Sequence, residues 1–116
     1  MAKGYKQRKD IEYGEVFTYI ARLETIRLMI SLATQHRWKI YQLDVKSAFL
    51  NGFLKEEIYV EEPLRYIEAN NKGKVYKLNK TLYGLKQAPR AWNARIDKYF
   101  QENGFEKCLY KHGMYV

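Results

Sequence analysis

The sequence has few of the residues that cross-link, kink or anchor a chain, with one cysteine, two prolines and two histidines among 116 residues. The single cysteine, Cys108, cannot close an internal disulfide or build a cysteine-rich zinc site, which excludes a disulfide-stabilised secreted scaffold and a zinc finger. No apolar run approaches membrane-spanning length, and the basic first residues lack the apolar core of a signal peptide. We therefore expect an intracellular protein, cytoplasmic or nuclear, without a membrane partner.

Several common catalytic motifs are also missing. The sequence has no GxGxxG and no Walker-type loop, so Rossmann and P-loop chemistry have no support. Ser47 has no nearby histidine to act as a base, which leaves a hydrolase triad unsupported. His36 and His112 stand far apart in the sequence and are expected at the surface or at helix ends.

Aromatic and basic side chains are abundant. Apolar residues make up 47% and aromatic residues 16%, enough for the core of one domain over residues 1–116. The formal net charge is +8, and residues 72–116 hold ten basic side chains against three acidic ones. Because Lys and Arg neutralise phosphates while Tyr and Trp stack on bases, nucleic acid is the leading class of partner. A solvated basic face without a ligand stays open as the alternative.

Apolar spacing of three and four residues predicts two helices. The first covers residues 22–36 and has a broad apolar face that we expect to be buried. The second begins near Pro89, which suits a first helical turn, and ends at Gly104.

Strands are predicted by alternation and by turn residues. Residues 38–45 are apolar on both alternating faces, which predicts a strand covered on both sides. Residues 58–60 and 75–78 flank a polar insert and predict a hairpin with a long loop. The remaining segments are expected to be a loose arm at the start, a short helix near Ser47 that is interrupted at Asn51-Gly52, and a short strand at residues 114–116.

Asp44 ends the predicted strand at residues 38–45. A carboxylate there is costly to bury unless it meets a cation, a metal ion or several donors. The following Lys46-Ser47-Ala48 could open a helix whose free N–H groups suit a phosphate, and a metal ion at Asp44 would then help to bind a nucleoside triphosphate. Two-metal phosphoryl transfer needs further carboxylates, and the sequence offers no obvious partner. That Asp44 merely caps the next turn stays open as a second interpretation.

The stretch from Leu82 to Trp92 is the second candidate. Gly84 permits a close approach of the backbone, and Lys86 and Arg90 near the helix start could contact a nucleic-acid strand and a base pair. The alternative is an ordinary corner between a loop and a helix, with Trp92 in the core.

Two motifs within these candidates are highly specific, LDVKSAFLNG at residues 43–52 and LYGLKQAPRAW at residues 82–92. With AKGYKQRKDIEYGEVF, EEIYVEEP and the stretches around the motifs, they cover almost the whole chain. The sequence closely resembles the reverse transcriptase domain of copia-type LTR retrotransposons. The resemblance implies an α+β fold, a partial right-hand polymerase with the lower fingers and the first part of the palm, in which two main helices pack on a small sheet.

The resemblance also implies a function and its partners. In the full enzyme the function is RNA-directed DNA polymerisation, in which a nucleotide is transferred to a primer 3′-hydroxyl with Mg²⁺ as the cofactor. The implied partners are an RNA or DNA template-primer and a dNTP.

Individual residues take roles from the same resemblance. Asp44 falls on the first metal-binding carboxylate, and the carbonyl of Val45 is the expected second ligand. Phe49 matches the bulky residue under the sugar that discriminates against a 2′-hydroxyl. The full nucleotide-binding set is Lys46, Ser47, Ala48, Phe49, Tyr83, Gly84 and Gln87. The template or primer set is Leu85, Lys86, Pro89 and Arg90.

The sequence departs from the family pattern in four places. The family's paired aspartates correspond to positions after Val116, and its basic fingers strand corresponds to positions before Met1. Tyr19 stands where proline is usual, and Leu64–Ile67 replace a Pro-x-Gly-aromatic turn.

We therefore expect a piece of a reverse transcriptase that is inactive as a polymerase by itself. The alternative is a basic nucleic-acid-binding module or a non-functional relic. A sheet without the strand pair that bears the aspartates would expose an edge, which predicts self-association.

Overall fold

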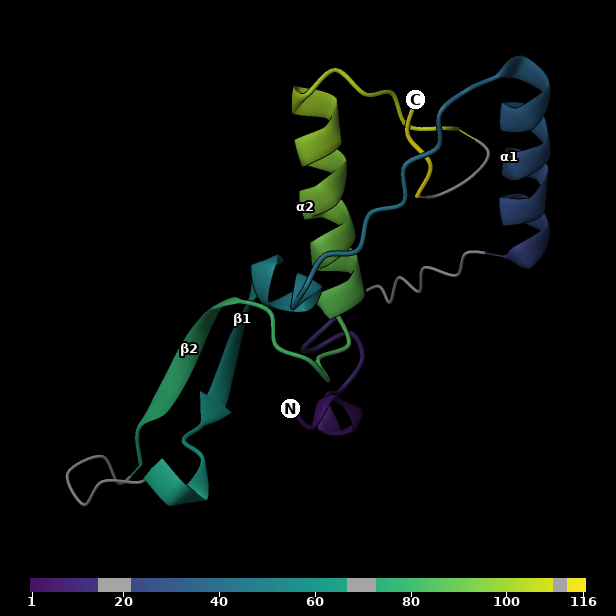
Figure 1. The fold of residues 1–116 in the computed structure, drawn as a ribbon. Helices are drawn as coiled ribbons and strands as arrows, with labels where there is room; N and C mark the ends of the chain where they lie inside the picture. The colour runs from purple at the N-terminus through teal and green to yellow at the C-terminus, as the bar shows by residue number, and fades with distance from the viewer. Residues whose placement is uncertain (15–21, 67–72, 110–112) are drawn as a thin grey trace. The chain divides into compact units, whose positions relative to one another are not determined.

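The computed structural model describes residues 1–14, 22–66, 73–109 and 113–116. The chain forms two compact units. We call Met1–Phe17 with Ser47–Arg95 the hairpin unit, and Thr18–Lys46 with Ile96–Val116 the helical unit. Within the described residues, two α-helices and a two-stranded antiparallel sheet make this an α+β chain (Figure 1), as the resemblance implies. The assignment of residues 1–116 to one domain stays a prediction.

The sheet of the hairpin unit consists of β1 (Phe53–Glu61) and β2 (Val75–Lys80). The strands run antiparallel, with Ile58 opposite Leu78 and an irregularity in the register toward the start of β1. Ile58 is buried whereas the next residue, Tyr59, is exposed, because successive side chains of a strand point to opposite faces. The structure confirms the predicted hairpin and begins its first strand earlier than the sequence suggests.

The loop that follows β1 contains one of the departures from the family pattern. Leu64–Tyr66 form a short 3-10 helix, η3. Ile67 and Tyr19 lie outside the described residues.

The helix α2 (Ala88–Glu102) confirms the helix that the sequence places after the glycine loop. Pro89 is its second residue, where a missing N–H breaks no intrahelical hydrogen bond. Gly104 follows with a φ of +82°, and the N–H of Phe105 donates to the carbonyl of Phe100 over 3.0 Å. This glycine-dependent turn ends the helix where the sequence predicts.

The helix α1 (Leu23–His36) is confirmed as a helix, but its broad buried face is not. Ala33 is its one buried side chain, while Leu23, Leu28 and Ile30 are more than half exposed. An apolar helix face is buried only when another element covers it. In the described part of the chain, α1 has no extended packing against another named helix or strand.

The strand predicted at residues 38–45 is not formed. Trp38 donates its N–H to the carbonyl of Ala33 over 2.8 Å, and the chain then continues without regular secondary structure and with exposed side chains. A strand exists through hydrogen bonds to a neighbouring strand, and neither β1 nor β2 pairs with this stretch. An apolar pattern on both faces is therefore not sufficient for a strand.

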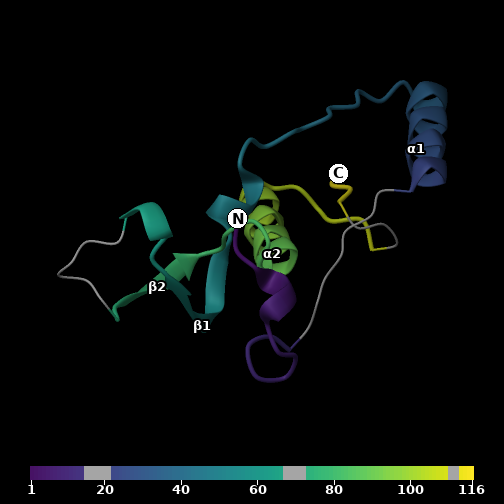
Figure 2. The ribbon, with the colours of Figure 1, turned by 90° about the horizontal axis from the view of Figure 1, so that it is seen from below.

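The first residues of the chain, expected as a loose arm, pack against the loop before α2. Gly4–Lys6 form a 3-10 helix, η1, and the N–H of Ala2 donates to the carbonyl of Tyr83 over 2.7 Å. Both ribbon views show η1, in purple, next to the chain that leads into α2 (Figures 1 and 2).

The core of the hairpin unit is small and lies where this loop meets β1. A short 3-10 helix, η2 (Ala48–Asn51), confirms the interrupted helix predicted near Ser47. Leu50 and Phe53, two large apolar side chains in and just after this segment, are exposed. The buried cluster consists of Ile58, Leu85 and Ala88, with Ala2, Phe49, Leu54, Leu78 and Leu82 packed against it.

The end of the helical unit is held by rings and by a half-buried carboxylate. The Phe100 ring stacks on Tyr115 with centroids 4.3 Å apart. Asp97 of α2 accepts hydrogen bonds from Lys107 over 2.6 Å and from the Tyr115 hydroxyl. The N–H of Cys108 donates to the carbonyl of Met114 over 2.9 Å, and Lys107 and Tyr115 form an isolated antiparallel bridge in place of the strand predicted at residues 114–116. Among the described helices, none has the length and apolarity needed to cross a membrane.

Candidate functional site

Asp44 and Val45 lie in the exposed, irregular stretch of the helical unit. Both residues are exposed, and the Asp44 carboxylate is not the buried strand-end acid that the sequence suggests. Within the described residues, no three His, Cys, Asp or Glu side chains gather in a way that could hold a metal ion. Two-metal phosphoryl transfer needs several hard-oxygen ligands, so the described residues do not by themselves fit a two-metal site.

The turn after Asp44 is built around Ser47, which has a φ of +53°. A non-glycine residue in the left-handed region carries about 1–3 kcal/mol of backbone strain, and such strain is commonest near functional sites. The Ser47 carbonyl accepts hydrogen bonds from the N–H of Leu50 over 3.0 Å and from the Asn51 side chain over 3.3 Å. The Ser47 side chain itself makes no capping hydrogen bond to η2. The predicted turn is thus formed, while its phosphate-binding role stays a prediction.

Phe49 and Tyr83, separated by 34 residues, come together in the hairpin unit. Their ring centroids are 5.0 Å apart and the rings are tilted by 43°. Thr81, which is 1% exposed, places them by donating its hydroxyl to the Phe49 carbonyl and its N–H to the Gly52 carbonyl over 2.9 Å. Two of the predicted nucleotide-binding side chains therefore form one aromatic surface, and Tyr83 remains 40% exposed on it.

Gly84 has a structural reason to be glycine. Its φ is +96°, and a Cβ at this position would overlap the carbonyl oxygen of Ala2. A Cβ at residue 4 would in turn overlap the carbonyl oxygen of Gly84. The two backbones therefore approach each other as closely as glycine allows, and the N-terminal arm covers one side of the loop.

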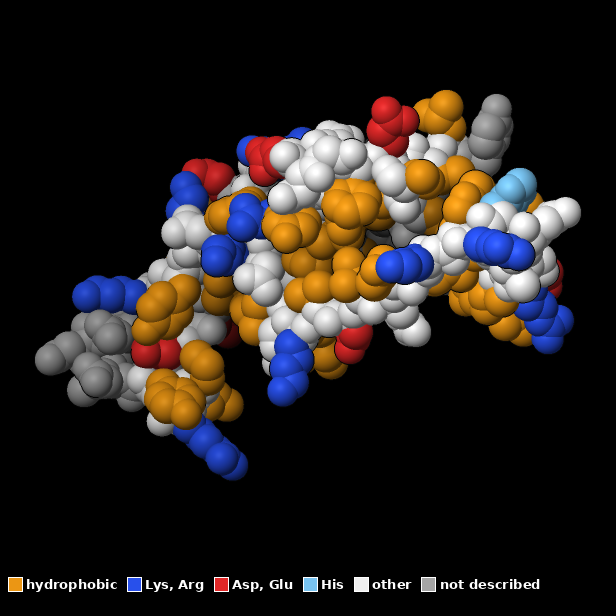
Figure 3. Space-filling view, turned by 45° about the horizontal axis from the view of Figure 1, so that its top comes forward, with side chains coloured by type: hydrophobic (Ala, Val, Ile, Leu, Met, Phe, Trp, Pro, Cys, Tyr) orange, Lys and Arg blue, Asp and Glu red, His pale blue; other side chains and the backbone are white. Residues whose placement is uncertain are grey.

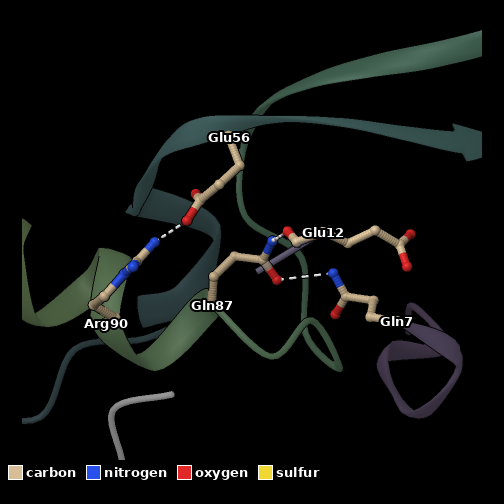
Figure 4. Close-up of polar contacts among 5 residues, drawn as sticks. All are labelled: Gln7, Glu12, Glu56, Gln87 and Arg90. Carbon is tan, nitrogen blue, oxygen red and sulfur yellow. Dashed lines mark hydrogen bonds and ion pairs between the residues drawn. The ribbon is translucent and has the colours of Figure 1, made fainter. Parts of the chain in front are cut away.

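Gln87 is fully buried, and its side-chain amide is bonded to protein at both ends (Figure 4). Its Oε1 accepts a hydrogen bond from Nε2 of Gln7 over 3.0 Å, and its Nε2 donates to the carbonyl of Glu12 over 3.3 Å. The N–H of Lys86 donates to Oε1 of Gln7 over 2.9 Å. In this conformation the Gln87 side chain is not open to a nucleotide, in contrast to what the resemblance implies.

The predicted template or primer residues divide into buried and open ones. The Leu85 side chain belongs to the core, whereas Lys86 is exposed. Arg90, about 30% exposed, pairs with Glu56 of β1, which is about 25% exposed. Figure 4 shows this ion pair between the start of α2 and the strand. Arg90 thus ties the helix to β1, and Pro89 lies partly buried in the first turn.

Sequence reasoning missed four residues that shape this region, namely Gln7, Glu12, Glu56 and Thr81. Glu56 lies in β1 and is paired with Arg90 of α2. Gln7 and Gln87 are 80 positions apart, and no spacing rule joins residues at that distance. The available signal was the presence of Gln7 in one of the stretches that carry the family resemblance.

An exposed ion pair crosses the hairpin between Glu57 of β1 and Lys77 of β2. The hydrogen bond and then the charge of Lys77 hold the pKa of Glu57 below its ordinary value of 4.5. The same two effects from Glu57 raise the pKa of Lys77 above 10.5. Because both side chains are solvated, the pair is screened and its contribution is small.

A profile of the family described as "Reverse transcriptase (RNA-dependent DNA polymerase)" matches residues 1–116. The chain belongs to this family. It is 43% identical over 115 residues to the retrovirus-related Pol polyprotein from transposon TNT 1-94 of Nicotiana tabacum, covering 95% of this chain and 9% of the polyprotein. It is 39% identical over 116 residues to the corresponding polyprotein from transposon RE1 of Arabidopsis thaliana, covering 100% of this chain and 8% of the polyprotein.

Relatives extend beyond plants. The chain is 40% identical over 73 residues to the putative transposon Ty5-1 protein YCL074W of Saccharomyces cerevisiae, which covers 63% of this chain and 24% of that protein. The chain therefore spans less than a tenth of the plant polyproteins and about a quarter of this yeast protein. No solved structure matches the chain.

The Glu57–Lys77 pair predicts how pairing of β1 with β2 depends on pH. The stabilisation by Glu57 is present above pH 4.5 and is lost as the pH falls through the lower pKa of the folded chain. The stabilisation by Lys77 is present below pH 10.5 and is lost as the pH rises through the higher pKa of the folded chain. We expect Glu57→Gln to reduce the acid limb of the amide exchange profile of the hairpin by a small, measurable amount, while Glu61→Gln leaves it unchanged. Identical profiles for wild type and Glu57→Gln would contradict the assignment.

Proposed function

We propose that this chain contributes the nucleotide-facing and template-facing surface of an RNA-directed DNA polymerase of the copia type. The observation that carries the proposal is the joined Phe49 and Tyr83 surface within a chain whose whole length matches the reverse transcriptase family. Two tilted aromatic rings with centroids 5.0 Å apart, which remain partly open, offer an apolar support for a sugar and a base. The retrotransposon relatives suggest an intracellular location, in the nucleus or the cytoplasm.

The other predicted residues divide into two kinds of role. Phe49 and Tyr83 support the sugar and base of a dNTP, while the backbone of Ser47 and Ala48, with the Lys46 ammonium, faces its phosphates. The exposed Lys86 ammonium meets a phosphate of the template or primer strand. The remaining predicted residues shape the loop and the helix start. In the loop, Gly84 approaches the arm closely, Leu85 lies in the core and the Gln87 amide is hydrogen-bonded. At the helix start, Pro89 occupies the first turn and Arg90 forms an ion pair.

A divalent metal ion is general to reverse transcriptases. Mg²⁺ in phosphoryl-transfer sites is bound by one or two carboxylates together with substrate phosphates. Asp44, with the Val45 carbonyl beside it, supplies one such carboxylate in our proposal. The described residues add no cluster of metal-ligating acids to it.

Nucleotide binding is testable on the 116-residue chain by NMR titration with dTTP and Mg²⁺. We expect resonances of Phe49, Tyr83 and Lys86 to shift, and Tyr83→Leu to abolish the shifts because it removes half of the aromatic surface. Tyr99→Leu is the matched control, since Tyr99 is exposed on α2 and lies outside the candidate site. Shifts that leave Phe49 and Tyr83 untouched, or that survive Tyr83→Leu, would refute this assignment.

Polymerisation by the chain alone is expected to be absent. Loss of most of a site's preorganised charge removes the largest contribution to phosphoryl transfer, and the described residues present Asp44 without a second metal-ligating cluster. A primer-extension assay with Mg²⁺ or Mn²⁺ measures this directly. Template-dependent extension that Asp44→Asn abolishes would show that the chain assembles a working site by itself.

A second candidate function is a nucleic-acid-binding module, and the charge distribution favours it. The net charge is +8, and on the face drawn in Figure 3 Lys and Arg side chains stand among exposed apolar ones. The two open edges of the two-stranded sheet also offer backbone groups for self-association. Self-association would make the oligomeric state depend on chain concentration, which sedimentation measures.

The module predicts weak, sequence-independent binding of single-stranded RNA that falls steeply with salt. For single strands the logarithm of the binding constant falls by about 0.7 per neutralised phosphate for each unit of log salt. We expect Lys86→Ala to reduce this slope by roughly one contact, while the charge-matched Lys98→Ala, on α2 beyond the candidate site, leaves it unchanged. Absence of binding at low salt would eliminate the module and favour a relic.

A further inference from the structure

We infer that Gln7 is a positioning residue, whose side-chain amide holds the loop Tyr83–Gln87 in the conformation that presents Tyr83 to Phe49. The consequence of this contact for nucleotide binding rests on the proposed function. The loop geometry that it explains is independent of that function. No motif assigns Gln7 a role, since the sequence places it in an arm without regular structure.

Four groups form a hydrogen-bond relay: the Lys86 N–H, the Gln7 amide, the Gln87 amide and the Glu12 carbonyl. The two backbone groups at its ends fix its direction. The N–H of Lys86 can only donate, so it must meet the oxygen of the Gln7 amide, and the distance is 2.9 Å. The Gln7 nitrogen then points at Oε1 of Gln87 over 3.0 Å. The carbonyl of Glu12 can only accept, and it receives the Gln87 nitrogen over 3.3 Å. Neither amide can be turned over without placing two donors or two acceptors face to face.

Because Gln87 is buried, breaking the hydrogen bonds of its amide would destabilise the loop. Gln87 is 0% exposed, and an amide left unpaired in such a place is destabilising because it keeps neither its protein partner nor a water. The two bonds of the Gln87 amide are part-buried, so leaving this conformation breaks bonds that water replaces poorly, whereas the Lys86–Gln7 bond is exposed. A chain of amide hydrogen bonds with a common direction also strengthens its members.

Close packing of the arm supports the relay from the other side. The N–H of Ala2 donates to the carbonyl of Tyr83 over 2.7 Å, at the residue whose ring contacts Phe49. Gly4 and Gly84 leave no space for a Cβ between the two backbones. The arm thus binds the loop at two places. The Ala2 backbone holds Tyr83, and the Gln7 side chain holds Lys86 and Gln87.

The first test removes the amide from the full 116-residue chain. In Gln7→Ala, the exchange rate of the Lys86 amide hydrogen, measured by NMR, should rise about fivefold, as expected for the loss of one hydrogen bond. The Ile58 amide in β1 reports that the hairpin remains folded. Tyr5→Ala is the control within the arm, because Tyr5 is 73% exposed. Equal exchange of the Lys86 amide in wild type and Gln7→Ala would overturn the inference.

The second test separates the relay from simple space filling. Gln7→Glu keeps an oxygen for Lys86 but at neutral pH has no hydrogen to give to Gln87. Below about pH 4.3, the ordinary pKa of a glutamate, the protonated carboxyl regains a donor. The Lys86 and Gln87 amide shifts of Gln7→Glu, each compared with wild type at the same pH, should therefore recover in acid, and those of Gln7→Ala should not. Shifts that do not depend on pH in Gln7→Glu would count against the relay.

The third test connects the loop to the nucleotide. We expect Gln7→Ala to weaken binding of dTTP with Mg²⁺ about fivefold, in line with the lost hydrogen bond. Unchanged affinity despite faster exchange at Lys86 would mean that Gln7 supports the arm without positioning the site, which overturns the inference. If wild type does not bind dTTP at all, the proposed function fails, while the exchange and shift measurements still decide whether Gln7 holds the loop.

Discussion

The contact between the N-terminal arm and the glycine loop is the constraint on which the candidate site depends. Gly4 and Gly84 meet at a separation that excludes any Cβ, and Ala2, Gln7 and Glu12 take up hydrogen-bonding groups of the loop. The loop lies between this arm and the core cluster around Ile58. Its conformation is therefore set from two sides, and the start of α2 follows from it.

Features that depend on neighbouring residues could be predicted from the sequence. The two helices follow from apolar spacing, from Pro89 in a first turn and from the left-handed turn at Gly104, because all of these act within a few residues. The hairpin follows from two apolar stretches with a polar insert. The strand expected at residues 38–45 was not formed, since a strand requires a paired neighbour and the sequence pattern shows only that such a neighbour would be tolerated.

The candidate site shows the same division. Residue types and the family resemblance point to the loop and to Phe49, but they do not show which side chains face inward. Gln87 stands between the exposed Lys86 and the buried Ala88, and its own amide is buried and bonded to Gln7 and Glu12. Buried polar groups in proteins are almost always hydrogen-bonded, so a glutamine beside a glycine loop is as compatible with support as with ligand contact. Only the partner, 80 positions away, decides between the two.

The two halves of the candidate site are determined to different degrees. The aromatic half, with Phe49 and Tyr83, is fixed by Thr81, by the core and by the arm, all within the hairpin unit. Asp44 lies in the other unit, in an exposed stretch without regular structure. A surface for a sugar and base needs only shape, which local packing and hydrogen bonds supply. A metal site needs several charged ligands held against their mutual repulsion. It follows that the aromatic surface proposed for a sugar and base is preorganised by the hairpin unit alone, independently of the carboxylate of Asp44.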